Sequence, residues 1–227
     1  CTVTLEGDYK SRKLIRALAR ENPGAEIVVM GCYATRAPDE VSALPGVVEV
    51  LTDKRRLPEL LARFGADPPR GISAFSRLHR ALVKVQDGCN AGCSYCIIPR
   101  VRPVLWSRPA DDAVDEVRRL AAQGHLEVVL TGIHLGHYGA GYEQSAGQPR
   151  DLAELVRRLL AIEGPRIRLS SLEASEVSCE LLTIMADRPD RLCPHLHLPL
   201  QSGSDAVLAR MRRPWSSGRF VDRCGEI

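Results

Sequence analysis

Hydrophobic and polar positions alternate along the chain with two different spacings, one typical of helices and one of buried strands. Apolar residues recur at helical spacing over residues 8–24 and end in a Pro-Gly pair. Two short apolar runs at 25–32 and 47–52 read as strands, and a second helical pattern covers 55–65. Strands that alternate with helices predict an α/β fold with a parallel sheet.

A second series of the same kind follows a Pro- and Gly-rich stretch that reads as a linker. We therefore predict one domain over residues 1–70, a linker over 71–80 and a second domain over 81–227. The second domain is made of β/α units whose strands end in polar or small residues, where β/α barrels gather their sites. Its predicted strands cover 81–86, 126–133, 166–173 and 195–203, and its predicted helices cover 110–124, 151–164, 178–187 and 204–211.

Composition narrows the class of protein without deciding its function. The 227 residues are 44% hydrophobic, and the net charge of +3 permits an anionic partner without demanding one. No apolar run approaches the length of a membrane span and no secretion signal opens the chain, so we expect a cytoplasmic protein without membrane contact. The chain begins with Cys1 and stops within a helical pattern, and we expect it to be a fragment of something longer.

The strongest chemical signal is a cysteine trio, Cys89, Cys93 and Cys96, spaced C-x3-C-x2-C after an apolar strand. Structural zinc normally takes four protein ligands, and no fourth one stands at a usual spacing. Three thiolates on one loop suit an iron–sulfur cluster with one iron left open to a small molecule. Structural zinc and simple packing thiols remain the alternatives.

Four motifs in order extend this signal over essentially the whole chain. They resemble the radical S-adenosylmethionine methylthiotransferases, and within them the MtaB type. The resemblance implies a partial flavodoxin-like N-terminal domain followed by a partial radical SAM (β/α) barrel. The motifs are "QDGCNAGCSYCIIPRVRP", "VVLTGIHLGHYG", "IRLSSLE" and "HLHLPLQSGSDAVLARMRRPW".

The resemblance also implies two 4Fe–4S clusters and S-adenosylmethionine as cofactors. The trio would hold the radical cluster, with the amino and carboxylate groups of S-adenosylmethionine on its open iron. Cys1, in "CTVT", and Cys32, in "GCYAT", match two of the three family cysteines that ligate an auxiliary cluster. The implied reaction is methylthiolation of carbon 2 of threonylcarbamoyl-adenosine beside the tRNA anticodon.

Several polar residues at strand ends are candidates for cofactor binding, and none is assigned to catalysis. Each also has a plainer interpretation, as a strand-end turn or a solvated polar group. Isolated cysteines are interpreted as structural, and the alternating histidines of the last predicted strand as packing a core or lining the barrel mouth rather than as metal ligands. The candidates are Tyr95, Thr131, Gly132, Glu173 and Gln201, with Ser202 beside the last; the isolated cysteines are Cys179, Cys193 and Cys224, and the histidines are His195 and His197.

The expected partners are a tRNA anticodon stem-loop and an electron donor such as flavodoxin or ferredoxin. Arg100, Arg102 and Arg108 adjoin the trio and are placed to hold an RNA backbone, whereas most other basic clusters read as solvated surface. Two positions depart from the family: Pro103 replaces a glycine and Trp215 replaces a tyrosine. The resemblance implies further β/α units and a C-terminal TRAM domain, which we expect to lie beyond this fragment.

Two kinds of alternative stay open. One keeps the enzyme class and changes the substrate to isopentenyl-adenosine in tRNA or to a ribosomal protein. The other is a non-catalytic metal-binding module, with zinc at the trio and the α/β scaffold as an interaction platform.

Overall fold

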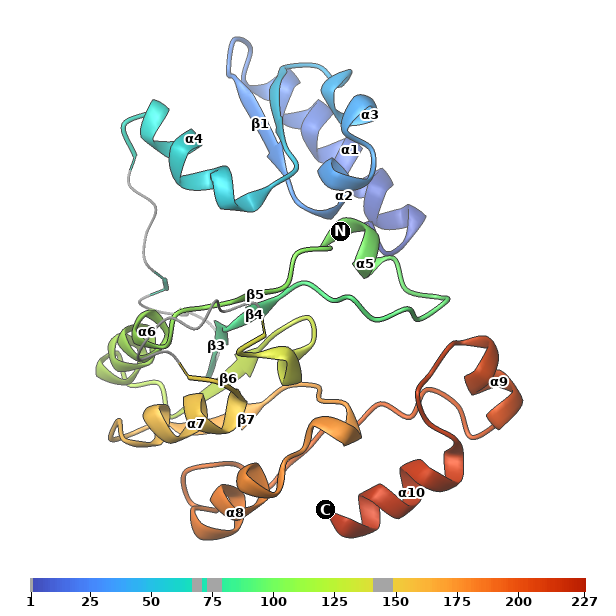
Figure 1. The fold of residues 1–227 in the computed structure, drawn as a ribbon. Coiled ribbons are helices and arrows are strands. Elements are labelled where there is room, and N and C mark those ends of the chain that lie inside the picture. The colour runs from blue at the N-terminus through green and yellow to red at the C-terminus, as the bar shows by residue number, and fades with distance from the viewer. Residues whose placement is uncertain (1, 67–70, 73–78, 141–148) are drawn as a thin grey trace. The chain divides into compact units, whose positions relative to one another are not determined.

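The computed structural model describes residues 2–66, 71–72, 79–140 and 149–227, and the chain forms two compact units (Figure 1). The first comprises residues 1–69 with 100–102, and the second comprises 70–99 with 103–227. The predicted linker falls partly outside the described residues, and the domain boundaries drawn from the sequence stay a prediction. None of the helices in the described part combines the length and apolar composition that a bilayer span needs.

The first unit pairs two parallel strands with short helices around them. Strand β1 lies beside β2, with Val29 opposite Val50. Thr4 begins the long first helix because its side-chain oxygen accepts a hydrogen bond from the Gly7 amide at 3.1 Å. The elements are α1 (Leu5–Glu21), β1 (Ile27–Met30), α2 (Cys32–Arg36), α3 (Pro38–Ser42), β2 (Val47–Leu51), the 3-10 turn η1 (Lys54–Arg56) and α4 (Leu57–Arg63).

A buried ion pair fixes α1 to α2 within this unit. The carboxylate of Asp8 is 4% exposed and accepts a hydrogen bond from Arg36 Nη2 at 2.8 Å. Arg36 also donates from Nε to Thr2 Oγ1 at 2.7 Å, so the chain just before α1 is held by the same guanidinium. Removal of the Arg36 charge would leave the buried Asp8 carboxylate poorly solvated, which makes the loss of this arginine costly.

The second unit is built on a parallel sheet of order β3-β6-β7. Ala81, Val128 and Ile167 stand in register across it. Its elements are β3 (Arg80–Lys84), β4 (Gln86–Asp87), β5 (Trp106–Ser107), α6 (Ala110–Ala122), β6 (Glu127–Thr131), η2 (Leu135–His137), α7 (Leu152–Leu160), β7 (Arg166–Leu169), η3 (Ala174–Glu176), α8 (Cys179–Asp187), α9 (Asp205–Arg210) and α10 (Ser217–Glu226). The turn α5 (Ile98–Val101) spans the boundary of the two units.

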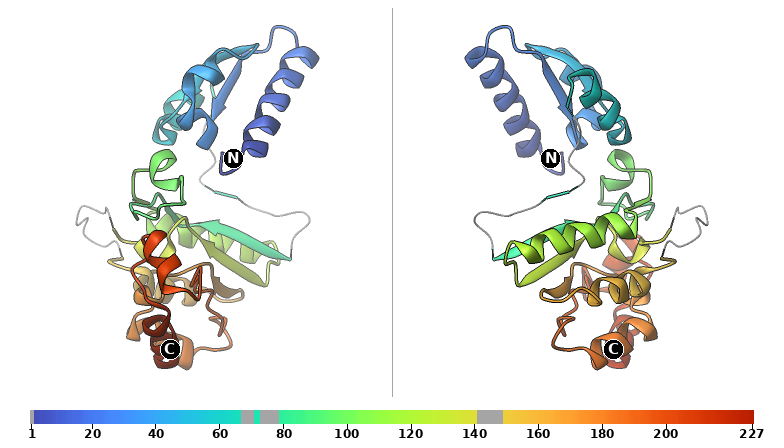
Figure 2. Two further views of the ribbon diagram at one scale, coloured as in Figure 1. Left: turned by 90° about the vertical axis from the view of Figure 1, so that its right-hand side faces the viewer. Right: turned by 90° about the vertical axis from the view of Figure 1, so that its left-hand side faces the viewer.

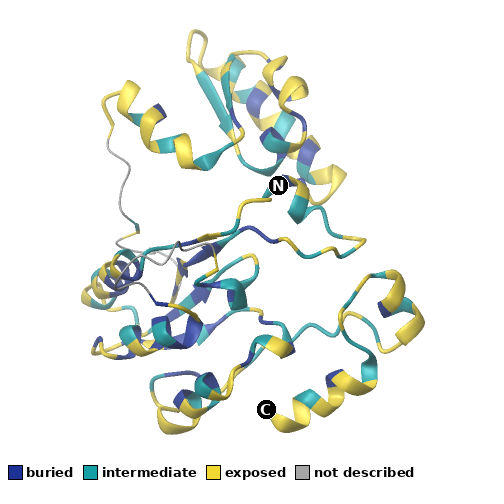
Figure 3. Cartoon of the chain, in the orientation of Figure 1, coloured by how far each residue is buried: buried dark blue, intermediate teal, exposed yellow. Residues whose placement is uncertain are grey.

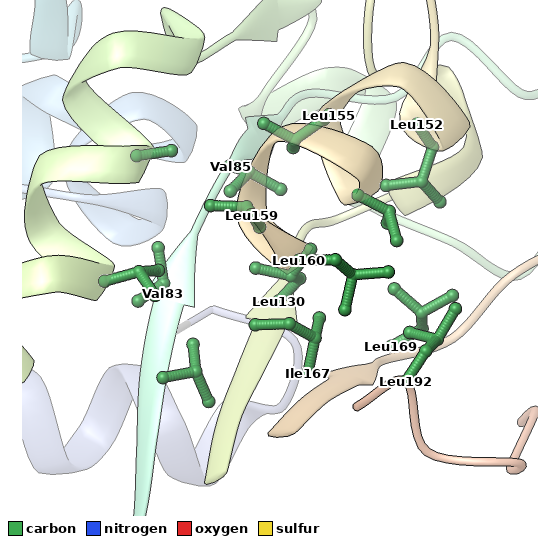
Figure 4. Packing of buried hydrophobic residues seen from close by; sticks show 14 of the residues in the cluster. Val83, Val85, Leu130, Leu152, Leu155, Leu159, Leu160, Ile167, Leu169 and Leu192 are labelled. Atoms are coloured by element: carbon green, nitrogen blue, oxygen red, sulfur yellow. The ribbon is translucent and has the colours of Figure 1, made fainter. Parts of the chain in front are cut away.

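The core of this unit lies between the sheet and the helices that cover it. Helix α6 packs along β3 (Figure 2) and α7 packs on β7. The inner faces are buried and the outer helix faces are exposed (Figure 3). Figure 4 shows the branched side chains that meet there, which include Val83, Leu130, Leu155, Leu159 and Ile167, each fully buried. The α/β fold with parallel strands that the sequence predicts is confirmed.

One predicted strand is not formed as such. Residues 195–203 make no ladder; the segment pairs through one isolated parallel bridge, between His197 and Ser171, and Leu192 just before it bridges to Ile167 of β7. Pro194 and Pro199 lack the amide hydrogen that a ladder needs, so the run is interrupted on both sides of the alternating residues. The sequence therefore overstates this strand while placing its path correctly beside β7.

Candidate functional site

The cysteine loop follows β3 and β4 and leaves the sheet at the ends of its parallel strands. Gly88 begins it with φ +85°, and a Cβ there would lie 1.9 Å from the carbonyl oxygen of Val104. Only glycine fits such a position. Cys89 is buried, whereas Cys93 and Cys96 are partly exposed and joined by a turn in which the Cys96 amide donates to the Cys93 carbonyl at 3.2 Å.

Burial and the neighbouring cysteines both act on the Cys89 thiol. Burial raises the pKa of the Cys89 thiol, the amide of Ala91 opposes this through a 3.4 Å contact to Sγ, and the charges of Cys96 and Cys93 raise it further. Among the described residues the trio does not form a ligand set within 4.8 Å. Three thiolates from one loop are the donor set of a 4Fe–4S cluster that leaves one iron without a protein ligand.

Gln86 connects the cysteine loop to the loop after β6. Its side chain is fully buried; Nε2 donates to the carbonyls of Asp87 and Gly88 at 2.9 and 2.8 Å, and Oε1 accepts from the His134 amide at 2.8 Å. A Cβ on Gly132 would lie 2.9 Å from Gln86 Oε1. Gly132 is therefore required by packing against this amide.

His134 stands between Cys89 and a carboxylate. Its Nδ1 lies 3.5 Å from Cys89 Sγ, and its Nε2 lies 2.6 Å from Glu176 Oε1. Burial raises the pKa of Glu176, but the hydrogen bond and charge of His134 lower it more, so its net pKa is below the usual value. The His137 ring stacks on His134 at 3.7 Å, and burial lowers its pKa.

These two histidines and Glu176 place their ligand atoms within 4.8 Å of one another, as a divalent ion would require. The 2.6 Å separation of His134 Nε2 and Glu176 Oε1 is nonetheless that of a direct polar contact. Ligands on a tetrahedral ion with bonds of about 2.0 Å would stand about 3.3 Å apart. The spacing of this pair is therefore closer than two ligands of one such ion would have.

A buried arginine stands on the other side of the trio. Arg213 Nη1 lies 3.7 Å from Cys93 Sγ, and Nη2 donates to Glu173 Oε2 at 2.5 Å and to the Pro199 carbonyl at 3.1 Å. Glu173, a candidate for cofactor binding, is thus already engaged by a guanidinium. Glu173 and Glu176 belong to the same capped turn, η3. Glu173 is linked to Cys93 through Arg213, and Glu176 is linked to Cys89 through His134.

The other predicted residues occupy varied surroundings. Tyr95 is half-exposed on the cysteine loop. Thr131 ends β6, where its carbonyl accepts from the Val85 amide at 2.9 Å. Gln201 is exposed, with φ 77°, a conformation that residues other than glycine seldom adopt. Such a position is more common at functional sites than elsewhere.

Of the two cysteines predicted to ligate an auxiliary cluster, the structure describes one. Cys32 is a partly exposed free thiol at the start of α2, and Arg102 Nε contacts its Sγ at 3.3 Å within the first unit. Cys1 lies outside the described residues. The assignment of both as cluster ligands stays a prediction.

Some interpretations from the sequence need correction. The Arg108 side chain is only 12% exposed and is paired with Glu116, so it does not present a charge to an RNA backbone. Cys179 and Cys224 are exposed thiols and not core residues, whereas Cys193 is buried as expected. His195 and His197 are both exposed, and His197 Nδ1 lies 2.6 Å from Ser171 Oγ.

Gln86, His134, Glu176 and Arg213 were not recognised from the sequence as site residues. The first three lie within or just after strand-end motifs, which was a usable signal. Arg213 lies 120 positions beyond Cys93; it belongs to the last quoted motif, but its basic cluster was interpreted as solvated surface.

Comparison with known proteins places this geometry in a family. The model of the "Radical SAM superfamily" matches residues 83–226, which contain the trio, the sheet and η3. The chain belongs to the radical SAM superfamily. Membership implies a 4Fe–4S cluster and S-adenosylmethionine, and the trio has the donor set for that cluster. A second model, "Uncharacterized protein family UPF0004", matches residues 1–53.

Curated relatives agree with the resemblance predicted from the motifs. The chain is 38% identical to the threonylcarbamoyladenosine tRNA methylthiotransferase MtaB of Bacillus subtilis, over 100% of the chain and 53% of the relative. It is 37% identical to the MtaB of Chlamydia pneumoniae, over 98% of the chain and 52% of the relative. A tRNA-2-methylthio-N(6)-dimethylallyladenosine synthase of Mycolicibacterium paratuberculosis is 35% identical, over 97% and 47%. The chain spans about half the length of the curated relatives it matches.

Solved structures support the fold. The radical S-adenosylmethionine methyltransferase TsrM from Kitasatospora setae superposes with a TM-score of 0.66 at 17% identity, over 95% of this chain and 50% of the other. The cobalamin-dependent enzyme OxsB gives 0.65 at 10% identity, over 96% and 37%. At these identities the likeness shows a shared radical SAM fold.

Proposed function

We propose that this radical SAM protein is a tRNA methylthiotransferase of the MtaB type, which adds a methylthio group to carbon 2 of threonylcarbamoyl-adenosine next to the anticodon. The observation that carries the proposal is the cysteine loop at the ends of the parallel strands, in a chain similar over its full length to MtaB proteins. The substrate rests on those relatives, since their printed names state it.

Cys89, Cys93 and Cys96 would hold the radical cluster in this proposal. When bound, the cluster and S-adenosylmethionine supply the radical chemistry that removes a hydrogen from an unactivated carbon. Three thiolates with no fourth protein ligand at a usual spacing favour a cluster over the zinc of a non-catalytic module. Tyr95, Thr131, Gly132 and Gln201 would then line the cofactor.

The described side chains have their own tasks around that site. The buried amide of Gln86 orients the loop carbonyls and holds the His134 backbone, so the first turn of the cysteine loop keeps one conformation. Leu135 and Tyr138, both buried, anchor the loop after β6 in the core. In this proposal these residues position the site.

The first unit would carry an auxiliary cluster. Cys32 and Cys1 would supply two of its ligands, and an electron donor such as flavodoxin or ferredoxin would reduce the protein in the cytoplasm. The partner would be a tRNA anticodon stem-loop. Arg100, which is exposed beside the loop, fits a phosphate contact, since such contacts orient a nucleic acid on its protein.

The test combines metal analysis with nucleoside analysis. The complete gene product would be reconstituted anaerobically and its iron and sulfide measured, with about four irons expected to disappear when the trio is changed to alanine. Nucleosides from tRNA of a deletion strain would be analysed by mass spectrometry, with the wild-type gene or the Cys93→Ala variant restored. Loss of the methylthio form of threonylcarbamoyl-adenosine, recovered only with the wild-type gene, is the expected result.

Other outcomes would redirect the proposal. Loss of a methylthio group from dimethylallyladenosine instead would move the substrate to that of the second class of relatives. Zinc at the trio without labile sulfide would contradict the enzyme and support the binding module.

A further inference from the structure

The guanidinium of Arg213 is buried beside the cysteine trio with part of its hydrogen-bonding capacity unused. Its side chain is 5% exposed, and Nε is buried without a partner in the described structure. Nη2 donates to the Glu173 carboxylate and to the Pro199 carbonyl, while Nη1 is directed at Cys93 Sγ. A guanidinium needed only by its carboxylate would pair through two parallel bonds. Here just one nitrogen binds Glu173, and a second faces the sulfur.

The backbone turn at the end of α9 fixes the position of Arg213. Arg212 has φ 55° at the end of α9, and the Arg213 amide bonds back to the Leu208 carbonyl at 3.0 Å, which terminates the helix and turns the chain. The cysteine loop meets the same turn: Ser94 Oγ donates to the Arg210 carbonyl at 2.7 Å and the Ser94 amide donates to Met211 at 3.1 Å. Two segments remote in sequence are therefore fixed against each other at Cys93.

We propose that Arg213 is a positioning residue of the trio, which donates to the Cys93 sulfur and raises the reduction potential of the cluster held there. The inference rests on the proposed cluster at the trio. Reduction adds a negative charge to a thiolate-ligated cluster, and hydrogen bonds to the sulfurs together with nearby charge set its potential. A fixed cation beside Cys93 stabilises the reduced state more than the oxidised one.

Glu173 is the counterpart of this cation. It holds the guanidinium in place but carries the opposite charge, so its own electrostatic effect on the cluster opposes that of Arg213. Neutralising the two residues one at a time should therefore move the potential in opposite directions. A merely structural pair would not show this, since loss of either partner would loosen the same contact.

The experiment compares midpoint potentials of reconstituted full-length protein. Arg213→Gln, Arg213→Lys and Glu173→Gln would be measured by redox titration with electron paramagnetic resonance, following the signal that changes when S-adenosylmethionine is added. Iron and sulfide would be counted for each. The matched control is Arg168→Gln, which removes an arginine paired with a carboxylate, Glu127, in the same unit without contact to the trio.

Arg213→Gln should make the potential more negative; a tenfold change in the one-electron equilibrium corresponds to ~59 mV. Arg213→Lys should shift it less, Glu173→Gln should make it more positive, and the control should match the wild type. Should Arg213→Gln lose its iron, the lysine and Glu173 variants still decide the sign. Unchanged potentials with iron retained, or shifts of both neutral variants in one direction, would overturn the inference. A wild type that binds no trio-dependent iron would instead overturn the proposed function, and the inference with it.

Discussion

The side-chain amide of Gln86 both donates and accepts hydrogen bonds inside the protein. No other residue type of that size can do both at this position. Its nitrogen serves two carbonyls of the cysteine loop and its oxygen serves the backbone of His134. A buried polar group stabilises only while all its partners are present. The local shape of the site thus depends on a residue that performs no chemistry.

Changing Gln86 to glutamate tests this dependence. The carboxylate keeps the acceptor for His134 but loses both donors and sets a negative charge against two carbonyl oxygens. We expect a loss of about 2–4 kcal/mol in the free energy of unfolding, since each buried unsatisfied group costs about 1–3 kcal/mol. Urea denaturation followed by circular dichroism measures it. Gln123→Glu, at an exposed helix end, is the matched control and should be near neutral.

Gly88 and Gly92 lie on the same loop and differ in what surrounds them. Alanine at Gly88 would combine a left-handed backbone with a clash against the Val104 carbonyl, whereas nothing lies within 4 Å of a Cβ on Gly92. We expect Gly88→Ala to cost at least about 2 kcal/mol, the sum of strain and overpacking. Thermal unfolding of both variants measures it, and equal melting temperatures would contradict the assigned role of Gly88.

At the scale of single residues, the sequence predicts sites whose members lie close together along the chain. The trio lies within eight positions, so its spacing alone revealed it. The contacts of Arg213 with Cys93 and of His134 with Cys89 join residues 120 and 45 positions apart. Spacing along the chain carries no information on such pairs, and only the fold brings them together.

One carboxylate ties together the three strands of the parallel sheet β3-β6-β7. Glu127 of β6 accepts from Arg168 of β7 at 2.7 Å and lies 2.6 Å from Arg80 Nε of β3. The hydrogen bond from Arg168 lowers the pKa of Glu127, although burial opposes this. The ionised carboxylate is therefore part of the folded sheet.

This pair predicts a pH dependence of stability. Because the folded pKa of Glu127 lies below the ordinary value of 4.5, its contribution is complete above that pH and is lost as the pH falls through the lowered value. Glu127→Gln should cost about 1.5–3 kcal/mol at pH 7, the range for hydrogen bonds to charged groups. The difference from wild type should shrink below pH 4.5, whereas the exposed Glu163→Gln should show none. Melting curves from pH 7 to 3 measure both; a pH-independent difference would refute the account.

Long elements were predictable and short ones were not. The helices α6 and α7 follow from their apolar faces, because thirteen and nine residues hold enough periodicity to show it. The single turns α2 and α3, five residues each, give no such pattern. The strand expected at 195–203 failed for the opposite reason: its alternation is real, but prolines remove the ladder donors.

Burial is distributed unevenly between the two units. The second holds an extended cluster of buried aliphatic side chains around three strands, whereas the small cluster of the first centres on Tyr33, Ala37 and Val41. The two-stranded sheet of the first unit has no fully buried residue in β1. Two strands alone are marginal, and three with a packed face are stable.

We therefore expect amide exchange to rank the elements. Amides of β6, which is paired on both sides, should exchange more slowly than those of β1 under native conditions, because opening β6 requires exposure of the large core. Hydrogen–deuterium exchange with mass spectrometry measures both in one sample. Equal protection of β1 and β6 would contradict this ranking.

The two bonds from Ser94 to the end of α9 have a thermodynamic consequence. They join positions 116 and 117 residues apart, so the loop that carries Cys93 and Cys96 is bonded to the turn that carries Arg213. A ligand that favours the ordered loop should therefore, by linkage, also stabilise the end of α9. The order of α9 should therefore report whether the cysteines hold a ligand. Substitutions in this surface helix should also be able to alter metal affinity without changing a residue that binds the metal.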